Sequence, residues 1–290
     1  MLIGTHDGVF HADEVMACAI LRRLYPDARI IRTRDPVCLA QCDILVDVGG
    51  VYDDAKKRYD HHQRGFDKKR ENGVKYSSAG LVWFHYGTIL GPLEVYEQVD
   101  RSLIAAIDAA DNGQRIHEAP GLVPVQTVSG LIASMNPTWL EEVPVNKRFD
   151  DALFLAGLVL ERAVQNALAR ISARKWVEDA LLKAHDGYLV LHKYMPWQEV
   201  VCGTFARQDV LYVLFPSEDG TWKVQGVPKT PGGFEVRKPL PAEWAGVLEG
   251  TMACISGVED AVFCHSQRFV CGARSLAGAE KLVKMAVDYK

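Results

Sequence analysis

The sequence has 290 residues, of which 48% are apolar, which is enough to bury a core and more natural for two domains than for one. Charged residues make up 24% of the chain, a normal level that argues against wholesale disorder. The formal net charge of -4 excludes nucleic-acid binding driven by overall charge, so any such site must be a local patch.

The first part of the chain alternates short apolar runs with helical patterns. Residues 1–5 are a strand candidate, and residues 12–25 have the three- and four-residue apolar spacing of a helix, which Pro26 ends. Residues 28–33 and 43–48 are further strand candidates. The second of these is an uninterrupted apolar run, which is typical of a strand that is buried on both faces.

Two more helices are expected in this part. One begins at Ser77 or Ser78, either of which can cap it, and the other covers residues 92–110. Alternating strands and helices predict a mainly parallel sheet flanked by helices. In such sheets ligands bind beyond the carboxyl ends of the strands, and His6 and Asp47 fall at those ends.

A long helical pattern and a second group of strands follow. The helix is expected over residues 149–184, capped by Asp150 or Asp151, and is either a connector between domains or ordinary core. Ser275 is expected to cap a closing helix. Short strands are expected at residues 188–192, 210–215, 222–227, 261–264 and 269–271, with a hairpin turn at Glu218-Asp219-Gly220.

The expected fold is therefore α/β. It has an N-terminal domain over residues 1–140, built on a mainly parallel sheet flanked by helices. A helical connector over residues 141–185 and a smaller C-terminal α/β domain over residues 186–290 follow.

Cysteine usage and hydropathy indicate the cellular setting. The seven cysteines include no C-x-x-C pair, which is typical of reduced, mostly buried thiols in a cytosolic protein. No signal peptide is visible, and no uninterrupted apolar run approaches the ~20 residues that span a bilayer. We therefore expect a soluble, cytoplasmic protein with no membrane partner. The oligomeric state stays open, a homodimer included.

Imidazole and carboxylate groups recur at expected strand ends and helix starts of the first domain. Each group alone has a simpler explanation: a lone histidine is usually a surface residue, and an aspartate after a strand is often a turn or cap residue. Their joint occurrence in one α/β domain favours a binuclear divalent-metal centre. The groups are His6, His11, Asp13, Asp47, Asp60-His61-His62 and Asp111.

The charge of such a centre suits phosphate chemistry. Two divalent cations bring four positive charges, and three aspartates (Asp13, Asp47 and Asp111) return three negative ones, so the centre can still attract a phosphate. Paired metals can acidify a bound water near neutral pH. Mixed imidazole and carboxylate ligation suits Mn²⁺ best, with Mg²⁺, Co²⁺ or Zn²⁺ as alternatives.

The order of these motifs resembles that of the DHH phosphoesterase superfamily, which includes nucleases, small-oligonucleotide phosphodiesterases and family II inorganic pyrophosphatases. The closer resemblance is to its melanocyte-proliferating-gene-type exonuclease branch, and it spans nearly the whole chain. The motifs that carry it are residues 5–14, 59–63, 77–83 and 108–113, together with 262–265, Phe269 and Gly272.

The resemblance implies roles for individual residues. One metal would be held by His6, His11 and Asp47, and the other by Asp13, His61, Asp111 and the bridging Asp47. His62 would face the substrate phosphate, and Asp60 belongs to the same catalytic motif. Most superfamily members have an aspartate in place of His11, which leaves the preferred metal open.

The fourth motif holds two aspartates. Asp111 is favoured as the ligand because Asp111-Asn112-Gly113 is similar to the Asp-Thr-Gly of relatives. Asp108 is then expected to orient a ligand histidine.

Two positively charged regions are candidates for substrate binding. A solvated loop is the simpler explanation for the run Lys56, Lys57, Arg58, Arg64, Lys68, Lys69 and Arg70, but its place beside the metal motifs favours contact with a phosphate backbone, through Arg64 and Lys68 above all. Near the C-terminus, the resemblance implies that Arg268, Arg274 and Ser275 bind phosphate or the terminal sugar.

The leading hypothesis is a metal-dependent phosphodiesterase, an exonuclease acting on RNA or short oligonucleotides through a metal-activated water. A second hypothesis is a hydrolase of a small phosphate compound such as pyrophosphate, a cyclic dinucleotide or a nucleotide. A third is a non-catalytic binding protein that keeps the fold.

Overall fold

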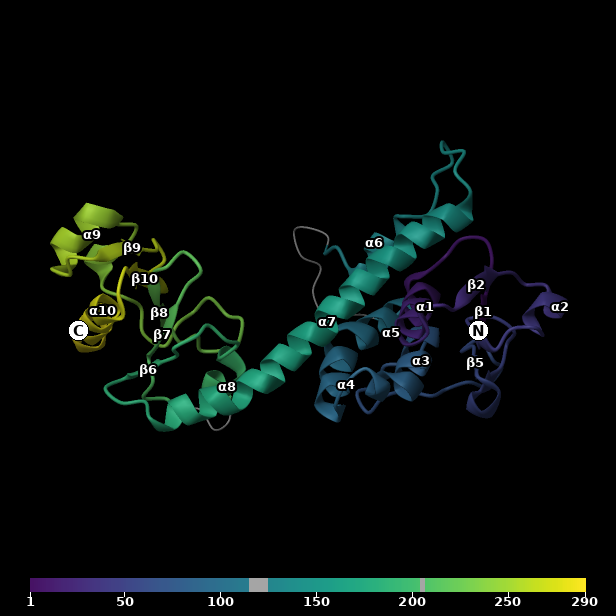
Figure 1. Ribbon diagram of the computed structural model, residues 1–290, viewed down its shortest axis with the longest axis horizontal. Helices are drawn as coiled ribbons and strands as arrows, with labels where there is room; N and C mark the ends of the chain where they lie inside the picture. Colours follow the sequence, from purple (N-terminus) through teal and green to yellow (C-terminus); the bar gives the residue numbers. More distant parts are fainter. Residues whose placement is uncertain (115–124, 204–206) are drawn as a thin grey trace. The chain divides into compact units, whose positions relative to one another are not determined.

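The computed structural model describes residues 1–114, 125–203 and 207–290. The chain forms two compact units, residues 1–168 and 169–290, and each contains a five-stranded sheet with helices beside it (Figure 1). The α/β class expected from the sequence is confirmed. The boundary between the units falls inside one long helix, and the expected domain limits at residues 140 and 185 stay predictions.

The sheet of the first unit has the strand order β2-β1-β3-β5-β4. Neighbouring strands are parallel except for β4, which is antiparallel to β5, so the expected mainly parallel sheet is confirmed. The two-residue strands were not expected, because they are too short to show any periodicity. The strands are β1 (Leu2–Thr5), β2 (Arg29–Arg32), β3 (Ile44–Val46), β4 (Tyr52–Asp53) and β5 (Arg58–Tyr59).

Helices of the first unit surround a buried central helix, α1. Its residues from Ala12 to Leu21 are all buried, because α1 packs against α3, α5 and α6 and contacts β3. A π-helical segment, Asp100–Ile104, joins α4 to α5, so the helix expected over residues 92–110 is one continuous helical stretch. These helices are α1 (Ala12–Leu24), α2 (Pro36–Leu39), α3 (Ser78–Tyr86), α4 (Leu93–Val99), α5 (Ala105–Asp111) and α6 (Val128–Ala133).

The start of α3 differs from the expected capped helix in one respect. Ser77 occupies the N-cap position but its side chain makes no capping hydrogen bond. Its hydroxyl donates instead to Asp108 at 2.5 Å, and the hydroxyl of Ser78 donates to Asp47 at 3.2 Å. Both serines are buried, and each hydroxyl donates a hydrogen bond to a buried carboxylate, which water cannot readily reach.

The long helix α7 runs from Val145 to Leu182, directly after Pro144. The expected start at Phe149 was therefore wrong by four residues, and Asp150 and Asp151 lie within the helix rather than at its cap. An aspartate near a helix start has the same sequence pattern as an N-cap, and the proline before Val145 is equally compatible with a helix start.

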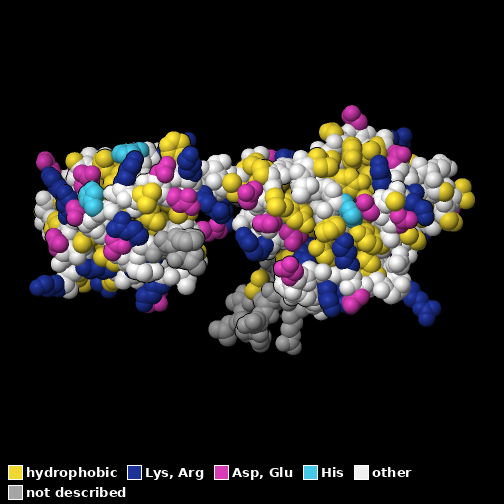
Figure 2. Space-filling model, turned by 90° about the horizontal axis from the view of Figure 1, so that it is seen from below, with side chains coloured by type: hydrophobic (Ala, Val, Ile, Leu, Met, Phe, Trp, Pro, Cys, Tyr) yellow, Lys and Arg dark blue, Asp and Glu magenta, His cyan; other side chains and the backbone are white. Residues whose placement is uncertain are grey.

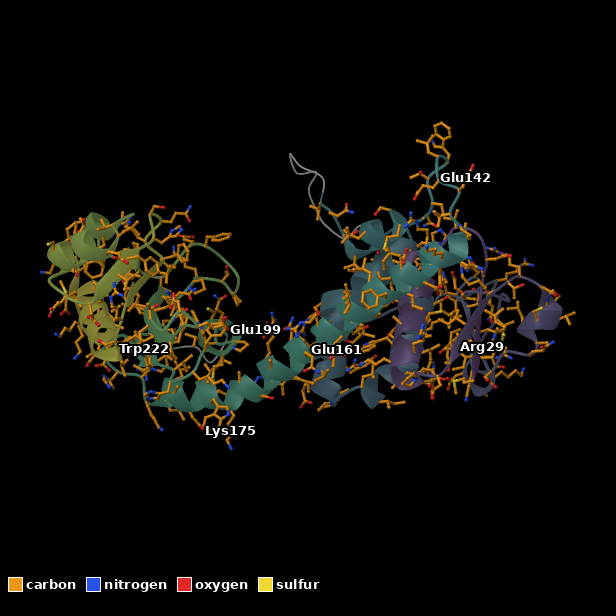
Figure 3. The ribbon with its side chains drawn as sticks, turned by 45° about the horizontal axis from the view of Figure 1, so that its top comes forward. Arg29, Glu142, Glu161, Lys175, Glu199 and Trp222 are labelled. Carbon is orange, nitrogen blue, oxygen red and sulfur yellow. The ribbon has the colours of Figure 1, made fainter. Side chains whose placement is uncertain are left out.

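By length and composition alone, α7 is also able to cross a membrane, with an 18-residue window of mean hydropathy 1.3 that is 33% buried. Core helices pass the same test. Within the first unit, Leu160 and Val164 are buried, and Glu161 pairs with Arg23 of α1. Figure 3 labels Glu161 on α7.

The sheet of the second unit has the order β6-β7-β8-β10-β9, in which only the β6–β7 pair is parallel. The expected hairpin between β7 and β8 is confirmed, and so is the cap of α10 by Ser275, which accepts from the N–H of Gly278 at 3.0 Å. The elements are β6 (Tyr188–Val190), β7 (Tyr212–Pro216), β8 (Trp222–Gly226), β9 (Ala261–Cys264), β10 (Val270–Ala273), α8 (Gln198–Cys202), α9 (Glu249–Ser256) and α10 (Leu276–Asp288).

Charged side chains of both signs are interspersed on the face drawn in Figure 2. Neither unit shows a broad area of one sign in that view. This agrees with the small formal net charge of the chain, so a phosphate on this face would meet individual cationic side chains and not a broad basic area.

Candidate metal centre

Four neighbouring parallel strands end on the same edge of the first sheet. Arg34 follows β2, His6 follows β1, Asp47 follows β3 and His61 follows β5. The carboxyl ends of parallel strands lie side by side, so the strand order fixes the order of these side chains along the edge. The prediction that His6 and Asp47 lie at strand ends is confirmed.

The backbone at Asp47 is unusual. Its φ of 52° lies in the left-handed region, which non-glycine residues rarely adopt, and Gly49 follows with a φ of 98°. Such a conformation costs of the order of 1 kcal/mol and is concentrated at functional sites. The turn directs the Asp47 carboxylate over the edge of the sheet.

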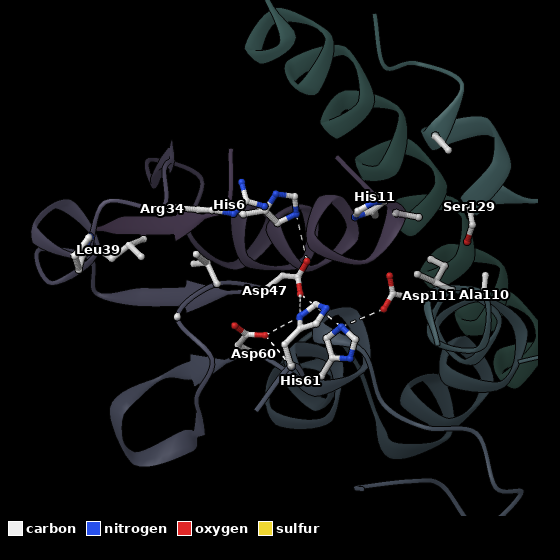
Figure 4. Close-up of a pocket in the computed structure, with 17 residues that line it drawn as sticks. His6, His11, Arg34, Leu39, Asp47, Asp60, His61, Ala110, Asp111 and Ser129 are labelled. Atoms are coloured by element: carbon white, nitrogen blue, oxygen red, sulfur yellow. Dashed lines mark hydrogen bonds and ion pairs between the residues drawn. The ribbon is translucent and has the colours of Figure 1, made fainter. Parts of the chain in front are cut away.

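The Asp47 carboxylate is the centre of a histidine cluster (Figure 4). One oxygen, Oδ2, lies 3.3 Å from Nε2 of His6. The other, Oδ1, lies 3.5 Å from Nε2 of His61 and 3.2 Å from Nδ1 of His62. Asp47 thus contacts imidazoles from two strand ends on its two oxygens, as a bridging carboxylate must.

A second group of donors faces the first. Donor atoms of His11, Asp13 and Asp111 all lie within 4.8 Å of one another, and they come from the start of α1 and the end of α5. His61 joins the groups, because its Nε2 lies 3.1 Å from Asp111 Oδ2 and 3.9 Å from Asp13 Oδ2.

Asp13 tests whether these residues fit a metal. Its side chain is fully buried, and among the described residues neither carboxylate oxygen has a hydrogen-bond partner. His61 Nε2 is also buried and, although it lies 3.1 Å from Asp111 Oδ2, makes no hydrogen bond with any described residue. A buried carboxylate without donors costs several kcal/mol, and a bound cation would remove that cost. The residues present therefore fit a divalent metal.

Glu14 also belongs to the cluster, although it was not expected there. It is fully buried, and its Oε1 lies 3.1 Å from Nε2 of His6. Both its oxygens accept the His11 N–H at 2.9 Å, so it closes the first turn of α1. A glutamate three residues after an N-cap is a common capping pattern, so Glu14 could not be recognised as a site residue from its position in the sequence.

The pKa values of the cluster reflect its mixed charges. Burial lowers the pKa of His6, but hydrogen bonds to Asp47 and Glu14 outweigh it and raise this pKa to about 10. Burial, Asp47 and Asp111 all raise the pKa of Asp13. Burial alone would raise the pKa of Asp47, but hydrogen bonds from His6 and His62 hold it well below its usual range.

Asp60 holds His62 in place. Its Oδ1 accepts the His62 backbone N–H at 2.9 Å and meets the ring Nδ1 at 3.0 Å, while its Oδ2 accepts the Gly50 N–H at 2.6 Å. Hydrogen bonding to Asp47, with Asp60 as a further cause, raises the pKa of His62 to about 9 against the effect of burial. The ring of His62 is 65% exposed, so it is available to a ligand.

The two aspartates of α5 have different surroundings. Asp111 faces His61, and its assignment as the metal ligand in preference to Asp108 stays a prediction. Asp108 accepts hydrogen bonds from Ser77 and from the backbone N–H of Gly80, and it pairs with Arg70 at 2.6 Å. It does not contact a ligand histidine, so the expected orienting contact was wrong, and Asp108 instead ties α5 to the start of α3.

A cavity of about 880 Å³ opens over the cluster. Among the described residues that line it, Arg34 is the only arginine or lysine. Figure 4 shows Arg34 and Leu39 on one side of the cluster, and Ala110 and Ser129 on the other. The wall residues outside the donor groups are Ala12, Arg34, Pro36, Leu39, Val48, Gly49, Ile107, Ala110, Ser129 and Ala133.

The cations expected to bind substrate do not line this cavity. Arg64 is exposed on the loop after β5, and the ammonium group of Lys68 lies 3.6 Å from the centre of the Phe84 ring. Lys68 also donates to the hydroxyl of Tyr52 at 3.2 Å. Arg64 and Lys68 as substrate contacts stay a prediction.

The residues expected to bind substrate in the second unit occupy two places. Arg268 lies in the β9–β10 turn, and its guanidinium donates to the Leu240 carbonyl at 3.3 Å. Arg274 and Ser275 precede α10, and the Ser275 hydroxyl donates to Asp260 at 2.5 Å. Their substrate contacts stay predictions.

Comparisons with known proteins find similarity along nearly the whole chain. A family model labelled MYG1 exonuclease and described as an uncharacterised protein family (UPF0160) matches residues 2–287. The chain is 36% identical to the MYG1 exonuclease of Homo sapiens, with 97% of this chain and 84% of that protein covered. No solved structure is significantly similar.

Two further relatives are covered almost completely. A MYG1 protein of Caenorhabditis elegans is 36% identical over 99% of this chain and 95% of its own length. A MYG1 protein of Schizosaccharomyces pombe is 32% identical over 99% of this chain and 97% of its own length.

Proposed function

The chain belongs to the MYG1 exonuclease family, and from this we propose that it is a metal-dependent phosphodiesterase that removes nucleotides from an end of RNA or of a short oligonucleotide. The printed name of the human relative supports the exonuclease activity. The order of the motifs along the chain supports membership of the DHH phosphoesterase superfamily.

The observation that carries the proposal is the buried Asp13 carboxylate without a hydrogen-bond donor, beside His61 and Asp111. We assign one metal to His6, His11 and Asp47, and the other to Asp13, His61, Asp111 and the shared Asp47. Glu14 adds a fourth carboxylate to the three aspartates, which would bring the centre with two divalent ions close to neutrality.

Bound divalent cations would acidify a water and polarise the phosphate, and Mn²⁺ suits this mixed donor set best. The chain's own residues would provide the geometry. The Asp7 carbonyl lies 3.0 Å from Nδ1 of His6, which leaves Nε2 of His6 for a metal. Asp60 directs His62 toward the phosphate, where a protonated imidazole stabilises developing negative charge.

The test uses purified protein, MnCl₂ and single-stranded RNA labelled at either end. We expect mononucleotides to be released from one end, and EDTA to stop the release. Asp47→Asn should retain the circular dichroism spectrum of the fold but lose at least about 100-fold in activity. The control is Asp67→Asn, which changes an exposed aspartate outside the cavity and should act normally.

Three outcomes would contradict the proposal. Near-normal turnover by Asp47→Asn would exclude the mechanism. Hydrolysis of pyrophosphate or of a cyclic dinucleotide without release from RNA would favour the small-phosphate hydrolase. Fewer than about one divalent ion per chain after manganese is supplied would favour a non-catalytic protein.

A further inference from the structure

Arg34 lines the cavity over the candidate centre, although no sequence motif predicted it as a site residue. We infer that Arg34 binds the phosphate next to the one that is cleaved, and so makes the site selective for substrates with at least two phosphates. This inference rests on the proposed function. Its first support is topological: β2 is the neighbour of β1 in the sheet, so Arg34 stands beside His6 at the common edge.

A shared atom links Arg34 to the centre. Nη1 of Arg34 donates to the backbone carbonyl oxygen of Asp7 at 2.5 Å, and Nδ1 of His6 lies 3.0 Å from the same oxygen. Nη1 also donates to the Asp7 carboxylate at 2.5 Å. The guanidinium is therefore held one carbonyl away from a proposed metal ligand.

The Arg34 guanidinium remains accessible. Its side chain is 61% exposed, and among the described residues its hydrogen bonds all use Nη1. The other guanidinium nitrogens are left for a ligand. A guanidinium presents a rigid fork of donors that matches two phosphate oxygens, so an arginine held on one side by Asp7 is suited to accept a phosphate on the other.

Two other arginines of the first unit, Arg32 and Arg70, are engaged in contacts within the protein. Arg32, two residues earlier on β2, lies 4.4 Å from the centre of the Phe149 ring and donates to the Gly8 carbonyl at 2.7 Å. Arg70 pairs with Asp100 and Asp108. Neither lines the cavity, so Arg34 alone among the described arginines and lysines can meet a phosphate there.

The wall beside Arg34 suits the rest of a nucleotide. Pro36 and Leu39 come from the same segment and line the same cavity, and Val48 follows β3. Apolar side chains give a base or sugar a surface to contact, while the adjacent arginine holds the phosphate. This pairing favours an oligonucleotide over an inorganic phosphate compound.

The test compares two substrates of the manganese-loaded protein. One is a pentaribonucleotide, which offers a neighbouring phosphate. The other is bis(p-nitrophenyl) phosphate, which has a single phosphate. For Arg34→Ala we expect kcat/KM on the pentanucleotide to fall about 10- to 100-fold, mostly through KM, because a charged hydrogen-bond pair is lost. On the single-phosphate ester we expect a change of less than about two-fold.

Salt dependence and matched variants sharpen the result. In Arg34→Ala the slope of log kcat/KM against log salt should be shallower by about 0.7, the value for one lost contact to a single strand. Arg34→Lys should restore part of the KM, since it keeps the charge without the fork. Arg29→Ala, which removes an exposed arginine at the opposite end of β2 and outside the cavity, should leave activity on both substrates unchanged.

Equal losses on the two substrates would place Arg34 at the cleaved phosphate or the metals and overturn the inference, as would no loss on either. If the unaltered protein hydrolyses neither substrate, the proposed function fails instead. The inference is then decided by binding of the fluorescein-labelled pentanucleotide with Ca²⁺. Weakening of at least about five-fold in Arg34→Ala but not in Arg29→Ala supports it, and equal binding overturns it.

Discussion

Nε2 of His61 lies 3.1 Å from Oδ2 of Asp111, although the two residues are fifty positions apart and come from different kinds of element. His61 follows the short strand β5, and Asp111 ends α5. With Asp47 on its other side, His61 joins a sheet edge to a helix end. A metal centre assembled this way links the two elements, so the state of the metals should be visible in the stability of the fold.

Asp13→Asn distinguishes two effects on the stability of the fold: destabilisation by a buried carboxylate without metal, and stabilisation by bound metal. Asparagine removes a buried carboxylate that faces Asp47 and Asp111, so without metal we expect the variant to be no less stable than the unaltered protein. Mn²⁺ at 100 times its dissociation constant should stabilise the unaltered protein by about 2.7 kcal/mol and the variant much less. Thermal unfolding with and without MnCl₂ measures both, and equal metal-induced shifts would contradict the assignment of Asp13.

Ser77 and Ser78 allow a controlled comparison of two variants. Both residues are buried and they are adjacent, but their hydroxyls donate hydrogen bonds to different carboxylates. Ser78 donates to Asp47, so Ser78→Ala should weaken Mn²⁺ binding about 10-fold or more with a small effect on unfolding. Ser77 donates to Asp108, so Ser77→Ala should lower the unfolding free energy by about 1–3 kcal/mol and leave metal affinity near normal. Calorimetric titration and chemical denaturation distinguish them; a reversed pattern would show that the hydroxyls act elsewhere.

Much of the centre could be predicted because its residues sit where sequence patterns end. His6 and Asp47 follow apolar runs, and Asp111 lies beside a turn pattern, so each marks the end of an element. Arg34 also follows a strand, but only the strand order places β2 beside β1, and periodicity does not fix that order.

Other features depend on packing that a local pattern does not encode. Arg70 belongs to a run of cations that is indistinguishable from a solvated loop, yet it is nearly buried against Asp100 and Asp108. Asp108 and Asp111 are similar in sequence context, and only the path of α5 shows which faces His61. The fold class was more predictable, since alternating apolar runs and helical patterns extend over many residues.

Two helical glycines test how tightly the Asp108 network is packed. A Cβ at Gly80 would overlap the Asp108 carboxylate, whereas one at Gly157 in α7 would meet nothing within 4 Å. We expect Gly80→Ala to destabilise the protein by several kcal/mol, because a buried carboxylate must move. Gly157→Ala should stabilise it by about 0.5–1 kcal/mol through helix propensity. Chemical denaturation compares them, and similar effects would mean that α3 and α5 pack loosely.

The last prediction concerns pH and Asp108. Burial raises the pKa of Asp108 to about 6, although Arg70, Ser77 and the Gly80 N–H oppose the rise. A carboxyl group with a higher pKa in the folded state binds its proton more tightly there than in the unfolded chain. Its protonation therefore stabilises the fold at low pH, and this contribution is lost as the pH rises through about 6.

Asp108→Asn, which cannot ionise, isolates this contribution. We expect the unfolding free energy of the metal-free protein, minus that of Asp108→Asn, to fall by about 3 kcal/mol between pH 4 and pH 7. Urea unfolding at half-unit pH steps measures the difference. If it instead rises with pH, the ion pair with Arg70 outweighs the burial of the carboxylate, and Asp108 stays ionised throughout this range.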